Sequence, residues 1–299
     1  MARVVHVGDS TARISVRHHQ LVSEGRDNTD HDNTAPLEDL DLVVLTTLNG
    51  LDLDLHTLQS AIEHGTGFVV CDEHFQPSGI LLPLFGAWNH TEVLHAQMAA
   101  SLPRRKRAWQ QIVRQKILQQ AESLVQDELI ARRLDELSSL VRSGDSSNIE
   151  ATAARIYWPA LMGPQFRRLP RTRVGVNGAL DYGYAIIRSL VARCIVGVGL
   201  HPALGIHHHS RSNPLCLADD LVEPLRPTVD RIVSGNREMF LGDLEPDGKI
   251  VLRKLLDLPF GCGEHHGLLT TACEHYVESF RSYLVGEGEA IKFPEVLDQ

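Results

Sequence analysis

The chain has 299 residues, a length that fits one large domain or two domains of ordinary size. Hydrophobic residues make up 43% and charged residues 22%, a balance that excludes an intrinsically disordered chain. Lys and Arg number 29 against 38 Asp and Glu, so the net charge is −9, which by itself argues against a polyanionic partner.

The sequence indicates neither a membrane protein nor a secreted protein. No apolar run approaches the roughly 20 residues of a membrane span, and the N-terminus has no apolar signal-peptide segment. The cysteines are odd in number and scattered, which is typical of reduced thiols. We therefore expect a cytoplasmic protein that does not contact a membrane. The cysteines are Cys71, Cys194, Cys216, Cys262 and Cys273.

The N-terminal part of the chain shows the short apolar runs and the period-two alternation of β-strands. One helix, near residues 55–64, interrupts the strands, and residues 24–34 are polar and typical of a loop. The predicted strands are 3–7, 12–16, 20–23, 41–46 and 67–71.

After Pro83 the apolar residues follow helical spacing. We therefore predict an α+β protein with a β-rich N-terminal domain over 1–84, a linker over 85–100, an all-α C-terminal domain over 101–287 and a tail over 288–299. Neither half shows a glycine-rich phosphate loop after a strand, which disfavours P-loop and dinucleotide-binding proteins. The predicted helices are 104–125, 128–141, 176–196, 214–233 and 268–284.

Basic residues are concentrated in two segments, 101–121 and 151–180, which contain no acidic residue. Each segment alone is typical of a solvated helix face. Both together, in a chain this acidic, favour a phosphate-binding surface, because screened electrostatic attraction is local. The candidate nucleic-acid contacts are Arg104, Arg107, Arg155, Arg167 and Arg168, and the other basic residues are Arg105, Lys106, Arg114, Lys116, Arg171 and Arg173.

Glu150 lies at the start of an otherwise apolar and aromatic helical segment. The residues Ser147-Asn148-Ile149-Glu150 match a capping box, in which the Glu150 carboxylate would accept a hydrogen bond from the backbone amide of Ser147. From this segment alone, the helix cap is the favoured interpretation.

Three consecutive histidines, His207, His208 and His209, lie in a loop predicted between two helices. Consecutive side chains cannot all point one way, so no more than two of them can serve one site. A solvated loop also accounts for the run.

The predicted helix 214–233 carries a third polar cluster. Asp219, Asp220 and Glu223 lie within about one and a half turns, so they repel one another unless they are solvated or share a cation. An exposed acidic face is the commoner outcome for such a cluster. Pro224 is expected to interrupt the helix, because it removes a backbone hydrogen bond.

Together, a glutamate, a histidine and a carboxylate-bearing helix supply the oxygen and nitrogen ligands that suit Mn²⁺ or Mg²⁺. Such a cation beside arginine-rich helices is suited to phosphodiester chemistry. The residues alone therefore indicate a metal-dependent nucleic-acid enzyme. A competing cluster of Cys262, His265, His266 and Cys273 fits no standard zinc spacing, because it lacks a Cys-x₂-Cys pair.

Four stretches of the chain resemble the Cas1 family, the CRISPR-associated integrases that catalyse spacer acquisition. The most specific are NIEATAARIYWPALMG (148–163) and NGALDYGYAIIRSLVARCIVGVGLHPALGIHHHSRSNPLCLADDLVEPLRPTVD (177–230). The stretches CDEHFQPSGILLPL (71–84) and RAWQQIVRQKILQQA (107–121) are similar to its type II branch.

This resemblance implies a β-rich domain followed by a helical catalytic domain. It also implies that Glu150, His208 and Glu223 are the catalytic metal ligands, with Asp220 and Asp219 as neighbours that assist them. Glu150 then acts as a ligand and not as a helix cap.

The activity implied by the resemblance is that of a metal-dependent DNA endonuclease and integrase of CRISPR adaptation. A prespacer 3′-hydroxyl would attack a phosphodiester of the CRISPR repeat by transesterification, with Mg²⁺ or Mn²⁺ as cofactor. The implied partners are double-stranded prespacer and repeat DNA, a second copy of the chain joined through the N-terminal domain, a Cas2 dimer in a heterohexamer, and the type II effector nuclease. The alternatives are a non-catalytic DNA-binding scaffold of the same fold and a zinc-dependent hydrolase.

Overall fold

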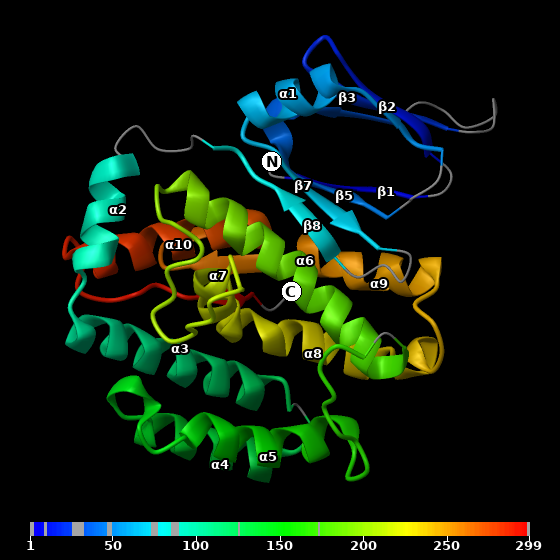
Figure 1. The fold of residues 1–299 in the computed structure, drawn as a ribbon. Coiled ribbons are helices and arrows are strands. Elements are labelled where there is room, and N and C mark those ends of the chain that lie inside the picture. Colours follow the sequence, from blue (N-terminus) through cyan, green and yellow to red (C-terminus); the bar gives the residue numbers. More distant parts are fainter. Residues whose placement is uncertain are drawn as a thin grey trace.

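A strand-rich N-terminal part lies above a larger helical part in Figure 1. The computed structural model describes residues 3–8, 11–25, 33–46, 50–72, 77–84, 90–124, 126–172 and 174–297. The order of its elements confirms the α+β class, and the change from strands to helices falls where the apolar periodicity changes in the sequence.

Two four-stranded sheets form the N-terminal part. The first has the order β1 (Arg3–Val7), β5 (Leu40–Leu45), β7 (Gly67–Cys71) and β8 (Pro77–Leu81), in which β8 is antiparallel and the other strands are parallel. The second has the order β4 (Asn33–Pro36), β3 (Gln20–Gly25), β2 (Thr11–Arg17) and β6 (Asp52–Leu53), and helix α1 (Leu55–Glu63) follows β6. All five predicted strands and the predicted helix are confirmed, whereas β4, β6 and β8 are additional. Most of the predicted loop 24–34 lies outside the described residues.

Strand β5 is buried on both faces. Val43 and Leu45 contribute to a small core inside the N-terminal part, whereas Leu42 and Val44 alternate with them and join the core of the helical part. Arg193 forms ion pairs with Asp41 in β5 and with Glu274 in the helical part. The first sheet is therefore packed against the helices as well as against the second sheet.

Helices dominate the rest of the chain, with α6 at the centre beneath the first sheet (Figure 1). Gly183 allows α6 to approach α8, because an added Cβ would lie 2.5 Å from Cγ1 of Val229. The helices are α2 (His90–Ala99), α3 (Leu102–Glu122), α4 (Glu128–Leu140), α5 (Ile149–Met162), α6 (Gly175–Gly197), α7 (Cys216–Leu221), α8 (Arg226–Gly235), α9 (Pro246–Asp257) and α10 (Leu269–Val285).

The structure adds detail in three places. The predicted helix 214–233 is divided into α7, a 3₁₀ turn over Glu223–Leu225 and α8, as expected from Pro224. Residues 90–99 of the predicted linker form α2. A small sheet of the order β10 (His265–Leu268), β9 (Pro259–Cys262) and β11 (Pro294–Val296) lies within the region predicted as all-α and its tail, and it was not foreseen.

None of the helices in the described part of the chain combines the length and apolar character needed to cross a bilayer. The five cysteines are buried and form no disulfide with one another.

Candidate functional site

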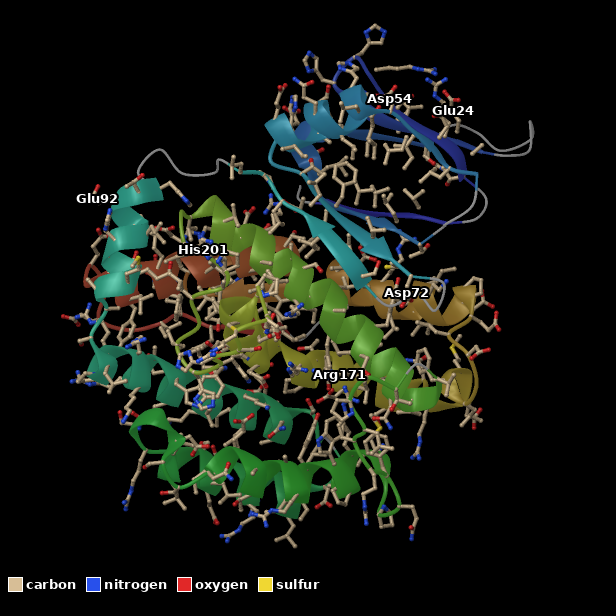
Figure 2. All side chains as sticks on the ribbon, in the orientation of Figure 1. Glu24, Asp54, Asp72, Glu92, Arg171 and His201 are labelled. Atoms are coloured by element: carbon tan, nitrogen blue, oxygen red, sulfur yellow. The ribbon has the colours of Figure 1, made fainter. Side chains whose placement is uncertain are left out.

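A cavity of about 1090 Å³ lies between helices α3, α5, α6 and the segment from α7 to α8. Three of the sequence-predicted acidic and histidine residues line it, namely His208, Asp219 and Glu223. Asp72, just after β7, and Arg171, in the segment before α6, also line the cavity and are labelled in Figure 2. The N-terminal part of the chain therefore reaches the cavity through at least one residue.

Glu150 and Glu223 are brought together by a lysine that the sequence analysis did not select as a site residue. Nζ of Lys116 lies 2.5 Å from Oε1 of Glu150 and 2.5 Å from Oε2 of Glu223. The two carboxylates come from α5 and the 3₁₀ turn after α7, and Lys116 comes from α3. Three separate elements thus place two carboxylates around one cation.

The charges around Glu223 favour its ionised form. Burial alone would raise the pKa of Glu223, but Arg226 and Lys116 outweigh it and lower this pKa to about 2. Nε of Arg226 lies 2.8 Å from the second carboxylate oxygen, Oε1. Burial alone would lower the pKa of Lys116, yet Glu223 and Glu150 raise it above its usual value. Glu223 is therefore a buried carboxylate held between two cations.

Glu150 does not form the capping box that its local sequence suggested. The amides of Ile149 and Glu150 donate instead to the carboxylate of Asp145, over 2.9 Å and 3.1 Å. Asn148, at the N-cap position, makes no side-chain capping bond. The favoured local interpretation was therefore wrong, because Asp145 satisfies the first amides of α5 and leaves the Glu150 carboxylate to bind Lys116.

The Asp220 carboxylate binds the backbone of the loop that carries the three histidines. Its carboxylate is fully buried and accepts hydrogen bonds from the backbone amides of Ile206, His207 and His208, over 2.7 Å, 3.1 Å and 3.0 Å. It also lies 2.7 Å from Nδ1 of His208. Gly205 is required at the start of this loop, since an added Cβ would lie 2.4 Å from the carbonyl oxygen of His208. A single carboxylate therefore fixes both the loop backbone and the imidazole.

The three histidines have different environments, as the geometry of consecutive residues predicted. The ring of His207 stacks on the buried ring of Trp109, with centroids 4.0 Å apart. The ring of His208 is 46% exposed and is held by Asp220, whose hydrogen bond raises the pKa of His208. His209 is exposed. Of the three, only His208 lines the large cavity.

Asp219 has a different set of partners from Asp220. Both of its carboxylate oxygens contact Arg188 of α6, and Nδ2 of Asn213 lies 2.5 Å from Oδ2. The acidic cluster is therefore not an exposed face: Asp220 and Glu223 are buried and Asp219 is ion-paired.

A buried polar group that the sequence analysis missed lies in the same cavity. Asp230 of α8 accepts hydrogen bonds from the hydroxyls of Tyr157 and Tyr184. Burial raises the pKa of Asp230 to about 6, although both tyrosines oppose this shift. No local motif marks these residues, because they lie far apart in the sequence.

Lys116 did carry a signal that could have been read from the sequence. On α3 the buried residues Trp109, Ile112, Val113 and Gln120 recur at helical spacing, and Lys116 falls on the same face. A lysine on a buried face requires an anionic partner, because an isolated buried charge is strongly unfavourable.

The predicted DNA-contacting arginines are divided between two regions. Arg168 lines the large cavity but is ion-paired with Asp181, whereas Arg155 and Arg167 are exposed. Arg104 and Arg107 line a separate cavity of about 620 Å³ beside the end of α10. The structure therefore does not bring these two arginines to the glutamate pair, and Arg173 lies outside the described residues.

Among the residues that the structure describes, no group of three or more His, Cys, Asp or Glu side chains is arranged to hold one metal ion. The Lys116 ammonium nevertheless marks a cation position between Glu150 and Glu223. If Nδ1 of His208 donates to Asp220, Nε2 keeps its lone pair for a ligand, as in many metal-binding histidines. Two carboxylates and an imidazole are donor types that suit a hard divalent cation.

The Cys/His cluster is not arranged as a zinc centre in the described chain. Sγ of Cys262 lies 3.5 Å from the carbonyl oxygen of Lys292, and burial raises the pKa of the Cys262 thiol to about 11. Cys273 is fully buried, and the ring of His265 stacks on that of His275 with centroids 3.7 Å apart. Cys262 and the two imidazoles thus already contact neighbours within the described chain, and these contacts give the zinc-hydrolase alternative no support.

Known proteins resemble the chain in both sequence and fold. A profile of the family described as "CRISPR associated protein Cas1" matches residues 5–243. The CRISPR-associated endonuclease Cas1 of Neisseria meningitidis serogroup C is 37% identical over 292 residues, which cover 95% of this chain and 93% of the relative.

Two solved structures share the fold. A casposase bound to integration product superposes with a TM-score of 0.78 at 18% identity, covering 97% of this chain and 92% of the other. A chain of a Cas6-RT-Cas1–Cas2 complex gives a TM-score of 0.73 at 17% identity, covering 96% of this chain and 35% of the other.

Proposed function

The chain belongs to the Cas1 family of CRISPR-associated proteins, and from this premise we propose that it is a metal-dependent DNA endonuclease and integrase of CRISPR adaptation. The reaction is a transesterification in which the 3′-hydroxyl of a prespacer duplex attacks a phosphodiester of the CRISPR repeat. A new phosphodiester joins the prespacer to the repeat, and the bond from phosphorus to the original 3′ oxygen breaks and releases a 3′-hydroxyl. The observation that carries the proposal is the pair Glu150 and Glu223, which share one cation position beside a cavity of about 1090 Å³.

The proposed ligands of Mg²⁺ or Mn²⁺ are Glu150, His208 and Glu223. Two carboxylates and an imidazole suit these cations, and Asp220 supplies the outer hydrogen bond that orients a ligating histidine. When bound, the cation would stabilise the negative charge that develops on the phosphodiester and favour deprotonation of the attacking hydroxyl.

The remaining residues act by position and charge. Arg226 holds Oε1 of Glu223, so that Oε2 faces the cation position. Asp220 keeps the His208 loop in place through three backbone amides. Arg167 and Arg155 are exposed and carry no carboxylate partner among the described ion pairs, so they are the better candidates for phosphate contacts than Arg168.

We further propose double-stranded DNA, a second copy of this chain and a Cas2 dimer as partners, with the type II effector nuclease joining in spacer selection. The resemblance to the type II branch and the shared fold with a chain of a Cas1–Cas2 complex support this assembly. The arginines in the segments 101–121 and 151–180 supply positive charge for DNA despite the net charge of −9.

A half-site integration assay tests the activity. The purified chain, with and without Cas2, is mixed with a labelled short duplex and a supercoiled plasmid that carries the repeat, in Mn²⁺, Mg²⁺ or EDTA. We expect label to join the plasmid only with metal, to be lost in His208→Ala, and to persist in His209→Ala, a matched change at the exposed neighbouring histidine.

The other outcomes contradict the proposal in different ways. DNA binding without joining, under every metal and with Cas2 present, would identify a non-catalytic scaffold. Equal joining by His208→Ala and the wild type would show that the site lies elsewhere. Stoichiometric zinc that disappears in Cys262→Ala would instead support the zinc-dependent hydrolase.

A further inference from the structure

The position of Lys116 points to a role beyond the proposed ligand set. We propose that the Lys116 ammonium is a built-in counter-cation, which holds Glu150 and Glu223 together in the metal-free chain and must leave before a divalent cation binds there. This inference rests on the metal site of the proposed function. It makes Lys116 a positioning residue that sets metal affinity.

The geometry makes the two cations alternatives. Nζ of Lys116 lies 2.5 Å from one oxygen of each glutamate, so the ammonium is in direct contact with both carboxylates. Side-chain exposure is 13% for Lys116 and 8% for Glu223, so water screens the contact weakly. A divalent cation on the same two oxygens would lie in contact with the ammonium, where repulsion between like charges is strongest.

Arg226 holds the Glu223 carboxylate in place when the lysine moves. Its other oxygen, Oε1, is ion-paired with Arg226, whose guanidinium lies 4.6 Å from the centroid of the Tyr184 ring. Arg226 thus retains the carboxylate while Oε2 changes from one cation to another. Arg cannot easily lose its charge, so this anchor does not depend on the exchange.

The cavity provides space for the displaced ammonium and a carboxylate, Asp230, with which it can pair. Lys116 itself lines the cavity of about 1090 Å³, and Asp230 and Gln120 line it too. A lysine side chain has four flexible carbons between Cα and the ammonium. It can therefore turn toward Asp230 while the α3 backbone stays in place, and its charge need not be left without a partner.

This exchange has a physical consequence for the metal-free chain. Without a cation, the buried carboxylate of Glu223 and the partly exposed carboxylate of Glu150 would repel each other and destabilise the fold. Lys116 removes that cost, but it also competes with the metal for the same oxygens. The chain therefore gains stability without metal and binds metal more weakly than its ligands alone would.

The test compares Lys116→Met with Lys116→Arg and with Lys106→Met, an exposed position on the same helix. Mn²⁺ alone is titrated against each full-length protein at one pH, and free Mn²⁺ is followed by electron paramagnetic resonance. Lys116→Met should bind Mn²⁺ at least about tenfold more tightly than the wild type, because a competing unit charge has gone. Lys116→Arg retains the charge, and Lys106→Met changes an exposed position. Both variants should bind Mn²⁺ with about the affinity of the wild type.

Thermal unfolding gives an independent readout. Without metal, Lys116→Met should melt several degrees below the wild type, and Mn²⁺ should raise its Tm by more than it raises that of the wild type. If the variant does not fold, crystals of the wild type grown with Mn²⁺ decide the question. Metal between Glu150 and Glu223, with the Lys116 ammonium moved away, supports the exchange.

Three results would overturn the inference, and they are distinguishable. The first result is a Mn²⁺ affinity that is unchanged or weaker in Lys116→Met, and the second is Mn²⁺ bound while Lys116 still bridges both glutamates. If integration by the wild type requires metal, either result overturns only the exchange of lysine for metal. No Mn²⁺ binding by any variant, together with integration in EDTA, overturns the proposed metal site as well.

Discussion

The buried carboxylate of Asp220 holds His208 at two points, the backbone amide over 3.0 Å and the ring Nδ1 over 2.7 Å. Asp220 lies 12 residues further along the chain, in α7, so the helix determines where the loop places its imidazole. Asp220, which the family resemblance implied as a neighbour of the metal ligands, thus holds the histidine loop in place. A single substitution tests this role.

Asp220→Asn should reduce half-site integration by roughly 10- to 100-fold, as is typical for the outer partner of a ligating histidine. The amide keeps the volume but replaces one acceptor oxygen with a donor, which then faces backbone N–H groups. The pKa of His208 should fall, because its hydrogen bond to Asp220 raises this pKa in the wild type. NMR titration of the ring measures that change, and Asp135→Asn, at an exposed position of α4, is the control. Unaltered integration would contradict the role.

Asp145→Ala should lower the free energy of unfolding by about 1 kcal/mol, the usual effect of losing a helix cap. Its carboxylate accepts from the first amides of α5, at Ile149 and Glu150. Ser147→Ala is the matched control, since Ser147 would be the cap in a capping box. Urea unfolding should show the loss only for Asp145→Ala, and the reverse result would restore the capping-box interpretation.

Asp230 should make stability depend on pH. Burial raises its pKa to about 6 from the usual value of 3.8, so the folded chain binds this proton more tightly than the unfolded chain. Its contribution to stability is therefore present below about pH 4 and is lost as the pH rises through about 6. Asp230→Asn has no such titration. As the pH rises from about 4 to about 7, the free energy of unfolding of the variant should therefore increase by about 2 kcal/mol relative to that of the wild type. Urea unfolding across this range measures the difference, and a constant difference would disprove the assignment.

Arg167 and Arg168 are neighbours with different expected effects. Arg167→Ala should weaken duplex binding and lower the slope of log affinity against log salt by about 1, the effect of one lost phosphate contact. Arg168→Ala should instead lower the unfolding free energy, because it removes the partner of Asp181 and a bond to Asn177. Fluorescence anisotropy at several salt concentrations and urea unfolding separate the two. Equal salt slopes for Arg167→Ala and the wild type would remove Arg167 from the DNA path.

Local patterns in the sequence predicted most of the elements. A short apolar run identified β5, because a strand buried on both faces is apolar along its length. Apolar spacing identified α3 and α6, because burying one face of a helix imposes a period that can be read along the chain. The break at Pro224 followed from its missing amide. Short pairings were not foreseen: β9 and β11 are brought together across more than thirty intervening residues, and strands this short carry little periodicity of their own.

The sequence by itself determined the α+β class, most of the longer helices and, through the motifs around Glu150, His208 and Glu223, the residues to consider. Tertiary structure alone decided which groups those residues contact. It assigned the α5 cap to Asp145, placed Asp220 beneath the histidine loop and put the Lys116 ammonium between two glutamates. The reason is physical: hydrogen bonds and charge pairs in a buried site depend on distances of a few ångströms between elements, and helix packing sets those distances.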